Sequence, residues 1–129
     1  MEQVIKNMNV RPLLERAEYE KLAAPEKGAM VNLRVGDEVR VEEMEGENVK
    51  VIVARTVASN PECIFKIYVE MSAEIQVDKK AYEALADKKD YFTKSPVARM
   101  LSAQIATVIA NLTANSPIGP MITVPMVQG

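Results

Sequence analysis

The sequence predicts an α+β protein in which a four-stranded antiparallel sheet, built as a meander plus an edge strand, packs on one long C-terminal helix. The first observation behind this prediction is residues 63–78, where apolar and polar side chains alternate almost without slip, the period of a half-buried strand. The second is residues 97–113, where the apolar residues change to helical spacing. At 129 residues the chain is long enough to bury its own core, so we expect a single domain over residues 1–129.

The first two strands are expected on either side of a charged connection. The first strand is placed near residues 4–11, because the proline that follows is tolerated only at a strand edge or end. Residues 15–29 are charged and contain Pro and Gly, which predicts a surface connection. The second strand covers residues 31–41, where alternation is interrupted at Gly36 and Asp37 by an expected bend or bulge.

The third and fourth strands continue a meander. Residues 49–57 are rich in β-branched side chains and follow a turn formed by Gly46 and Asn48. A second tight turn at residues 59–61 leads into the fourth strand, residues 63–78. Consecutive strands joined by short turns pair with each other, so the first strand is expected to add to one edge.

The second half of the chain is predicted to be helical and then extended. Residues 79–89 read as one short helix, and Ser95 followed by Pro96 is an N-cap with proline at the first helical position. The apolar stripe of the long helix is Val97, Leu101, Ile105, Val108, Ile109 and Leu112. Residues 116–127 contain several prolines and large apolar side chains, so we expect an extended tail that lies against the protein.

The long helix is apolar around most of its circumference, which indicates that more than one of its sides is covered. A second subunit is the natural cover, so we expect a homodimer or a homotetramer. The residues expected at the interface between subunits are Leu101, Gln104, Ile105 and Val108.

Composition excludes several classes of protein. A net charge of −2 and the absence of Trp argue against nucleic-acid binding. No apolar run approaches the roughly 18 residues of a membrane span, and the N-terminus lacks the order of a signal peptide. The single cysteine, Cys63, has no partner for an intrachain disulfide and falls on the apolar side of its strand. We therefore expect a reduced, cytoplasmic protein without membrane insertion.

Catalytic chemistry has little support in the sequence. Because the chain has no His, Ser-His-Asp and Cys-His arrangements are impossible, and so are zinc sites that need His. The carboxylates of residues 37–47 lack calcium-loop spacing, and no phosphate-binding glycine motif is present. We expect no enzyme activity, no cofactor and no metal. An enzyme that uses these carboxylates with a bound metal stays open as a minor alternative.

Two stretches resemble the SecB export chaperone family. Residues 69–77 (VEMSAEIQV) are similar to the family's fourth strand, V-E-Y-x-G-x-F-x-I. Residues 109–113 (IANLT), followed at a fixed interval by residues 120–127 (PMITVPMV), are similar to its ending, I-S-N-L…P-x-L-N-L-x-P-V. The order of the expected elements over residues 4–127 resembles that of the family as well.

The resemblance implies an ATP-independent chaperone, a holdase, that binds unfolded or pre-export polypeptides in apolar grooves beside the helix and the crossover after the first strand. Its subunits would form a dimer or a dimer of dimers, with the long helices between sheets. The client-binding residues implied here are Leu22, Met30, Met71, Leu101, Met121, Ile122 and Val124.

The chain also departs from the family. Tyr68 stands where the family often has the Glu that docks the translocase motor, and the sequence stops at Gly129, where family members continue into another helix and a metal-binding tail. A translocase partner is therefore expected only if other residues supply the docking contacts.

A second hypothesis is a non-catalytic oligomeric adaptor for one specific folded partner, such as a toxin-system or phage-related protein. In that hypothesis the groove is filled by the chain's own tail. The partner would dock on the polar side of the fourth strand, through Lys66, Tyr68, Glu70 and Glu74.

Overall fold

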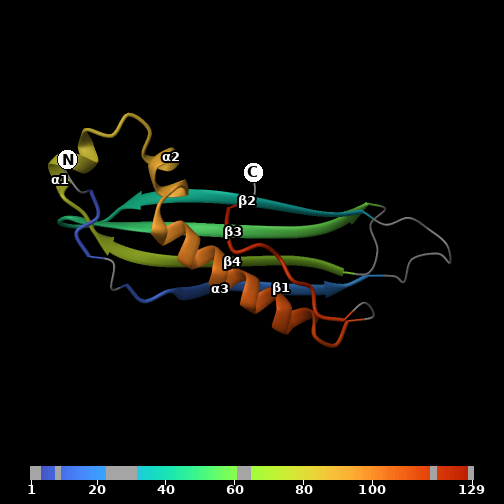
Figure 1. Ribbon diagram of the computed structural model, residues 1–129. Helices are drawn as coiled ribbons and strands as arrows, with labels where there is room; N and C mark the ends of the chain where they lie inside the picture. The colour runs from blue at the N-terminus through green and yellow to red at the C-terminus, as the bar shows by residue number, and fades with distance from the viewer. Residues whose placement is uncertain (1–3, 8–9, 23–31, 61–64, 117–118, 128–129) are drawn as a thin grey trace.

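The protein is described by a computed structural model, which covers residues 4–7, 10–22, 32–60, 65–116 and 119–127. Its elements are β1 (Leu13–Lys21), β2 (Asn32–Glu43), β3 (Asn48–Asn60), β4 (Phe65–Gln76), α1 (Lys79–Glu83), α2 (Lys88–Thr93) and α3 (Pro96–Thr113). The strands form one four-stranded antiparallel sheet in the order β1-β4-β3-β2 (Figure 1). The predicted fold class is confirmed: β2, β3 and β4 form the meander, and β1 adds to the edge of β4.

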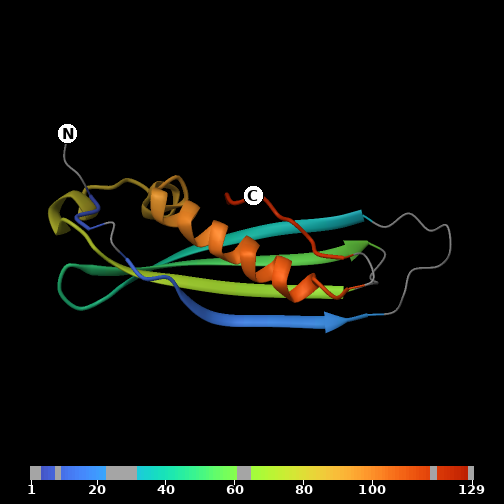
Figure 2. The same ribbon diagram turned by 60° about the horizontal axis from the view of Figure 1, so that its bottom comes forward.

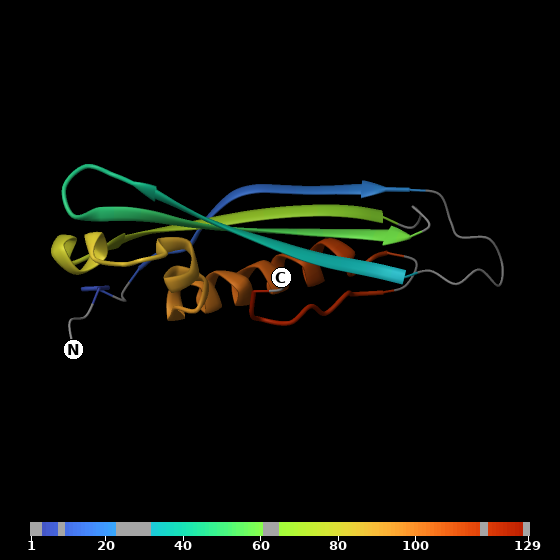
Figure 3. The same cartoon turned by 90° about the horizontal axis from the view of Figure 1, so that it is seen from above.

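One face of the sheet is apolar and carries the core, and we call it the dry face. The side chains of β4 alternate as predicted, with Phe65, Ile67 and Val69 buried on the dry face. The same face of β3 contributes Val49 and Val53, among others. Helix α3 crosses this face, and among the described residues no helix lies over the opposite, polar face (Figures 2 and 3). The chain is therefore a two-layer structure with one polar sheet surface open to solvent.

Helix α3 begins and packs as the sequence predicted. The Ser95 hydroxyl accepts a hydrogen bond from the backbone N–H of Ala98 at 3.4 Å, and Pro96 occupies the first turn. The stripe of α3 turns toward the sheet, with Val97, Leu101, Ile105 and Ile109 fully buried and Val108 and Leu112 half-buried.

The predicted position of the first strand was wrong. Residues 4–7 form only an isolated bridge, between Ile5 and Val77, whereas β1 occupies Leu13–Lys21 and so extends from residue 15 onward into the segment expected to be a surface connection. Almost every side chain of β1 is exposed, so its sequence shows no alternation. Pairing with β4, rather than burial, makes this segment a strand.

Two further local predictions were wrong. The single helix expected over residues 79–89 is two short helices, because Asp78 and Asp87 each accept a hydrogen bond from a backbone N–H three residues ahead and so cap α1 and α2 separately. The bulge expected at Gly36 is absent from the continuous β2–β3 register, and a register shift instead lies in β1 between Leu14 and Arg16.

The turn between β2 and β3 follows the prediction. Gly46 has φ of 71°, a conformation that residues with a side chain rarely adopt. The fourth-strand prediction is confirmed over Phe65–Gln76. Cys63 and Met30 lie outside the described residues.

Candidate functional site

A buried ion pair interrupts the dry face. Arg55 on β3 and Asp37 on β2 are register partners, and both side chains have no solvent exposure. Arg55 Nε donates to Asp37 Oδ1 at 2.8 Å and Nη2 donates to Oδ2 at 2.9 Å, a bidentate arrangement. Alternation places Val53 and Val57 on the same face of β3, so the charged pair lies within an apolar strip.

The same guanidinium holds the C-terminal residues 119–127, which we call the tail segment. Nη1 donates to the hydroxyl of Thr123 at 2.7 Å and to the carbonyl oxygen of Val124 at 2.8 Å, and Nη2 donates to the carbonyl oxygen of Met126 at 2.8 Å. The tail segment thus runs back over β3 and β2 on the side of the sheet that α3 occupies (Figure 3). The expectation that the tail lies against the protein is confirmed.

A second anchor fixes the start of the tail segment to the end of α3. The buried hydroxyl of Thr113 accepts a hydrogen bond from the backbone N–H of Met121 at 2.7 Å and donates to the carbonyl of Ile109 at 2.7 Å. Gly119, with φ of 79°, reverses the chain between these two elements.

The tail segment itself buries few side chains. Thr123 is buried, but Ile122, Val124 and Met126 are 80%, 45% and 53% exposed. Because apolar burial scales with the area removed from water, these side chains contribute little to holding the tail segment in place. The described attachments are the hydrogen bonds that Arg55 donates, the hydrogen bond that Thr113 accepts, and the packing of half-buried Met121 and Val127 against the core.

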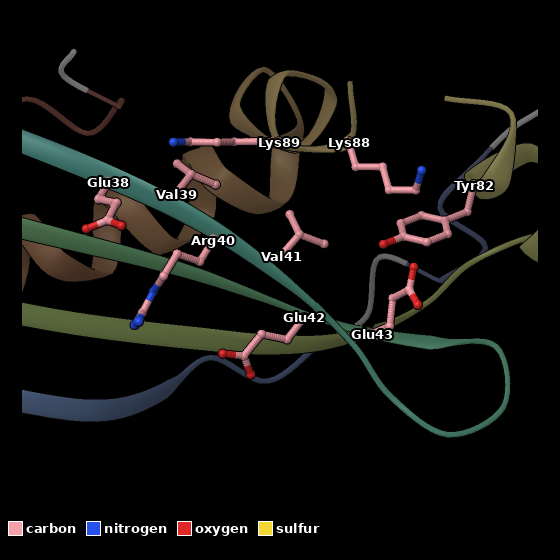
Figure 4. Close-up of a pocket in the computed structure, with 9 residues that line it drawn as sticks. All are labelled: Glu38, Val39, Arg40, Val41, Glu42, Glu43, Tyr82, Lys88 and Lys89. Carbon is pink, nitrogen blue, oxygen red and sulfur yellow. The ribbon is translucent and has the colours of Figure 1, made fainter. Parts of the chain in front are cut away.

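A groove of about 700 Å³ lies between β2, the edge strand of the sheet, and the short helices (Figure 4). Half-buried Val41 is the more exposed of its apolar residues, since Val39 and Tyr82 are only 3% and 4% exposed, and Lys88 and Lys89 stand on the helical side. The remaining lining residues are Glu38, Arg40, Glu42 and Glu43. An edge strand presents unpaired backbone groups, so this groove combines an apolar surface with backbone hydrogen-bonding capacity.

Tyr82 and its neighbours form the end of this groove. The Lys88 ammonium lies 5.2 Å from the centre of the Tyr82 ring, a cation–π contact. Burial raises the pKa of the Tyr82 hydroxyl, and the nearby Glu43 carboxylate raises the pKa further. The phenol therefore stays neutral at physiological pH and serves as a polar end to an apolar wall.

The groove and the tail segment follow each other along β2. The groove begins at Glu38 and Val39, directly after Asp37, which binds the tail-holding Arg55. At the other side, Met126 and Val127 line a smaller cavity of about 300 Å³ together with residues 93–95 of the α2–α3 junction. The groove and this cavity share no lining residue, but both are bordered by helix α2, through Lys88 and Lys89 at the groove and Thr93 at the cavity.

The polar face of the sheet carries a lattice of charged side chains. Arg40 donates to Glu70 at 2.6 Å, and the hydroxyl of Tyr68 donates to the same carboxylate at 2.8 Å. Burial, followed by the hydrogen bond to Glu70, raises the pKa of Tyr68. Of the other residues predicted for partner docking, Lys66 and Glu74 are exposed.

A second polar cluster lies further along this face. The Ser72 hydroxyl donates to Glu15 at 2.5 Å, and the Lys50 ammonium lies 3.3 Å from the same carboxylate. The hydrogen bond from Ser72, and then that from Lys50, lowers the pKa of Glu15.

The predicted client-binding residues are distributed over different environments. Met71 and Leu101 are buried in the core, Leu22 and Met121 are half-buried, and Ile122 and Val124 are exposed. Met121, Ile122 and Val124 belong to the tail segment.

Of the predicted interface residues, Leu101 and Ile105 are buried against the sheet of their own chain. Val108 is half-buried and Gln104 is exposed. Of the four predicted interface residues, Gln104 is therefore accessible to a neighbour and Val108 is accessible in part.

Arg55 and the β2 groove were not identified from the sequence. A signal was present, because Arg55 and Asp37 both fall on apolar positions of their alternating strands.

The carboxylates of residues 37–47 do not converge. Asp37 is bound to Arg55, and Figure 4 shows Glu42 and Glu43 on different sides of β2. In the part of the chain that the structure describes, no group of three or more His, Cys, Asp or Glu side chains is placed to hold a metal ion. Within those same residues no helix has the length and apolar character to cross a membrane.

The fold is that of a known solved protein. Over 93% of this chain and 91% of the other, the structure is similar to a SecB-like chaperone from Mycobacterium tuberculosis in complex with a ChAD peptide from the HigA1 antitoxin, with a TM-score of 0.69 and 13% sequence identity. No protein-family model matches the sequence, and the curated proteins contain no significant match to it. The chain therefore has the SecB-like fold that its sequence resemblance implied.

Proposed function

We propose that this protein is an ATP-independent chaperone that holds non-native or pre-export polypeptides in extended form. The observation that carries the proposal is the groove beside β2, where half-buried Val41, with the nearly covered Val39 and Tyr82 next to it, adjoins the edge strand of the described sheet. Extended segments bind sheet edges through main-chain hydrogen bonds, while alternate side chains fill apolar surface. The SecB-like fold supports the same function, since the similar structure from Mycobacterium tuberculosis holds a peptide.

The charge of the groove favours certain clients. Lys88 and Lys89 stand over the apolar wall, whereas Arg40 and Glu42 point to the other face of β2. A segment that alternates apolar side chains with neutral or acidic ones would place its polar residues near the two lysines. We therefore propose clients with exposed apolar segments of low positive charge.

The remaining parts of the proposal concern assembly and location. We propose a cytoplasmic homodimer or homotetramer that associates through the outer face of α3, including Gln104 and Val108. Leu22, Met30, Met71, Leu101, Met121, Ile122 and Val124 are kept as proposed client contacts, and those buried here would act only where a client opens the packing above them. No cofactor or catalysis is part of this function.

Equilibrium binding to three permanently unfolded proteins of unrelated sequence tests the proposal, with fluorescence anisotropy of the labelled client as the readout and no nucleotide present. The proposal requires binding to all three with affinities within about one order of magnitude. Failure to bind any of them, at concentrations where the chain is folded by circular dichroism, would exclude general holding of non-native polypeptides.

An adaptor for one specific partner is the second candidate, and the polar face favours it. Arg40, Glu70 and Tyr68 are already ordered by mutual hydrogen bonds, so a partner reading this surface would meet a fixed pattern of charge. Binding to none of the unfolded proteins, together with loss of a native partner after Glu70→Lys but not after Glu43→Lys on the groove side of β2, would establish the adaptor.

A further inference from the structure

We infer that Arg55 forms a second client-binding site, one that reads polypeptide backbone, and that the tail segment is a built-in occupant which a client displaces. This inference rests on the proposed function and deepens it by naming the site and its internal competitor. The tail segment is an extended polypeptide on the dry face of the sheet, so the structure already contains one example of the interaction.

The contacts made by Arg55 are largely independent of side-chain identity. Two of its tail acceptors are the backbone carbonyls of Val124 and Met126, at 2.8 Å each, and only Thr123 contributes a side chain. Every residue of a client has a backbone carbonyl. A guanidinium fixed by Asp37 keeps its remaining donors aimed at these positions whichever chain lies there.

The tail segment is a weak competitor for its own site. Ile122, Val124 and Met126 are 80%, 45% and 53% exposed, so three of the five large apolar side chains of the tail segment are largely in water, whereas Met121 and Val127 are half-buried against the core. A client could place its apolar side chains on the dry-face valines of β2 and β3, such as Val39, Val53 and Val57. It would then bury more apolar surface than the tail segment does, while its carbonyls accept the same hydrogen bonds from Arg55. When a client replaces the tail segment, its carbonyls take over as acceptors, so the buried Arg55 guanidinium is not left without hydrogen-bond partners.

The position of the site gives displacement a route. The β2 groove starts at Glu38, next to the Arg55-bound Asp37, and helix α2 borders both this groove and the cavity that Met126 and Val127 line. A client that first enters the open groove beside Val39 and Val41 would reach the end of the tail segment by extending along β2. Binding and displacement would then occur on one continuous strip of the sheet.

The test compares the unaltered chain with two variants, using reduced and carboxymethylated lactalbumin as a permanently unfolded probe. In the first variant a Gly/Ser sequence of equal length replaces residues 120–127, which keeps chain length but raises the entropic cost of ordering the tail segment. The second variant, Ile122→Ser, is the matched control because it changes an exposed side chain and leaves the hydrogen bonds to Arg55 intact. Affinity is measured by anisotropy.

We expect the Gly/Ser variant to bind the probe at least about threefold more tightly than the unaltered chain, because a site occupied by its own tail is available to a client only part of the time. The Ile122→Ser variant should change affinity by less than about twofold. Equal affinity of the unaltered chain and the Gly/Ser variant would overturn the inference while leaving the proposed function standing. Absence of binding by all three chains would overturn both.

A direct observation of the tail segment completes the test and does not depend on the stability of the Gly/Ser variant. A nitroxide is attached at Val124→Cys in a Cys63→Ser background, and at Lys66→Cys on the polar face as the control. Probe binding should increase the mobility of the nitroxide at position 124 and leave that at position 66 unchanged. Reduced or unaltered mobility at position 124 with the probe bound would show that clients do not displace the tail segment, contrary to the inference.

Discussion

Arg55 and Asp37 face each other across the β2–β3 hairpin as a fully buried, bidentate ion pair, with Nε–Oδ1 and Nη2–Oδ2 distances of 2.8 and 2.9 Å. The pair stands in the middle of an apolar surface, and its guanidinium also binds the tail segment. One side chain therefore joins two strands and the C-terminal residues in a single network.

Removing the cation from this network should be costly. In Arg55→Met, the Asp37 carboxylate stays buried without its partner, so we expect the free energy of unfolding to fall by about 3–5 kcal/mol. The double variant Arg55→Met/Asp37→Leu removes the unpaired charge and should recover part of the loss. Urea denaturation monitored by circular dichroism measures both. A loss below about 1 kcal/mol for the single variant would mean that the pair is not buried as described.

The Thr113 hydroxyl should matter for the tail segment. In Thr113→Val, the backbone N–H of Met121 loses its acceptor, and we expect a cost of about 1–2 kcal/mol in the free energy of unfolding. Thr113→Ser keeps the hydroxyl and serves as the control, with a smaller loss. Thr113→Ser lacks the methyl group and Thr113→Val lacks the hydroxyl, so a loss in Thr113→Val no larger than that in Thr113→Ser would contradict a dominant role of the hydrogen bond.

Removal of the Ser102 hydroxyl is expected not to lower the free energy of unfolding. Its side chain is fully buried in α3, and its hydroxyl has no hydrogen-bond partner among the described residues. Ser102→Ala should therefore leave the free energy of unfolding unchanged or raise it by up to about 1 kcal/mol. Thermal and urea denaturation give the value, and a clear destabilisation would reveal that the hydroxyl is bonded.

Acid should weaken the polar cluster of β1, β3 and β4. Because the pKa of Glu15 is lowered in the folded chain, its contribution to stability is present above the ordinary value of 4.5 and is lost as the pH falls through the lowered value. Glu15→Gln should reduce the free energy of unfolding by about 0.5 kcal/mol at pH 7, the size of an exposed pair. The difference between the two chains should shrink below pH 4.5. A constant difference across that range would contradict the assignment.

The β2 groove has neighbouring residues that form a matched pair for testing. Val41 lies on the apolar wall, whereas Glu42 points to the opposite face of the strand (Figure 4). Val41→Lys should weaken binding of an unfolded client by about fivefold, because the apolar contact is lost and a charge is placed on the wall. Glu42→Lys should have little effect on that affinity. Similar losses from both changes would indicate a charge effect that is not specific to the groove.

Alternation was enough to predict the meander, and helical spacing of apolar residues was enough to predict the long helix. The alternation in β4 and the Ser95–Pro96 cap are local sequence signals. Predictions from such signals are correct when the local preference agrees with the tertiary environment. β1 could not be placed this way, because its exposed side chains carry no period and only its hydrogen bonds to β4 define it. Asp78 and Asp87 are residue types that favour N-caps, so two helix starts could have been predicted there. The many polar residues around both positions made these two signals difficult to distinguish.

The Arg55–Asp37 ion pair was not predicted, although the fold class was predicted correctly. Arg55 and Asp37 each interrupt an apolar alternation, and aligning their two strands from the turn at Gly46 makes them partners. The contact of Arg55 with the tail segment could not be predicted from the sequence. Arg55 and its acceptors are separated by 68 to 71 positions along the chain. Long-range hydrogen bonds of this kind leave no periodic signal.

The most direct measurement is the suppression of aggregation of a chemically unfolded, slow-folding protein, titrated with this chain in the absence of nucleotide. Holding of extended segments predicts suppression near stoichiometric amounts of subunit, with weaker suppression by Val41→Lys than by Glu42→Lys. Aggregation that is unaffected at large molar excess would contradict the chaperone function and leave the adaptor for one dedicated partner.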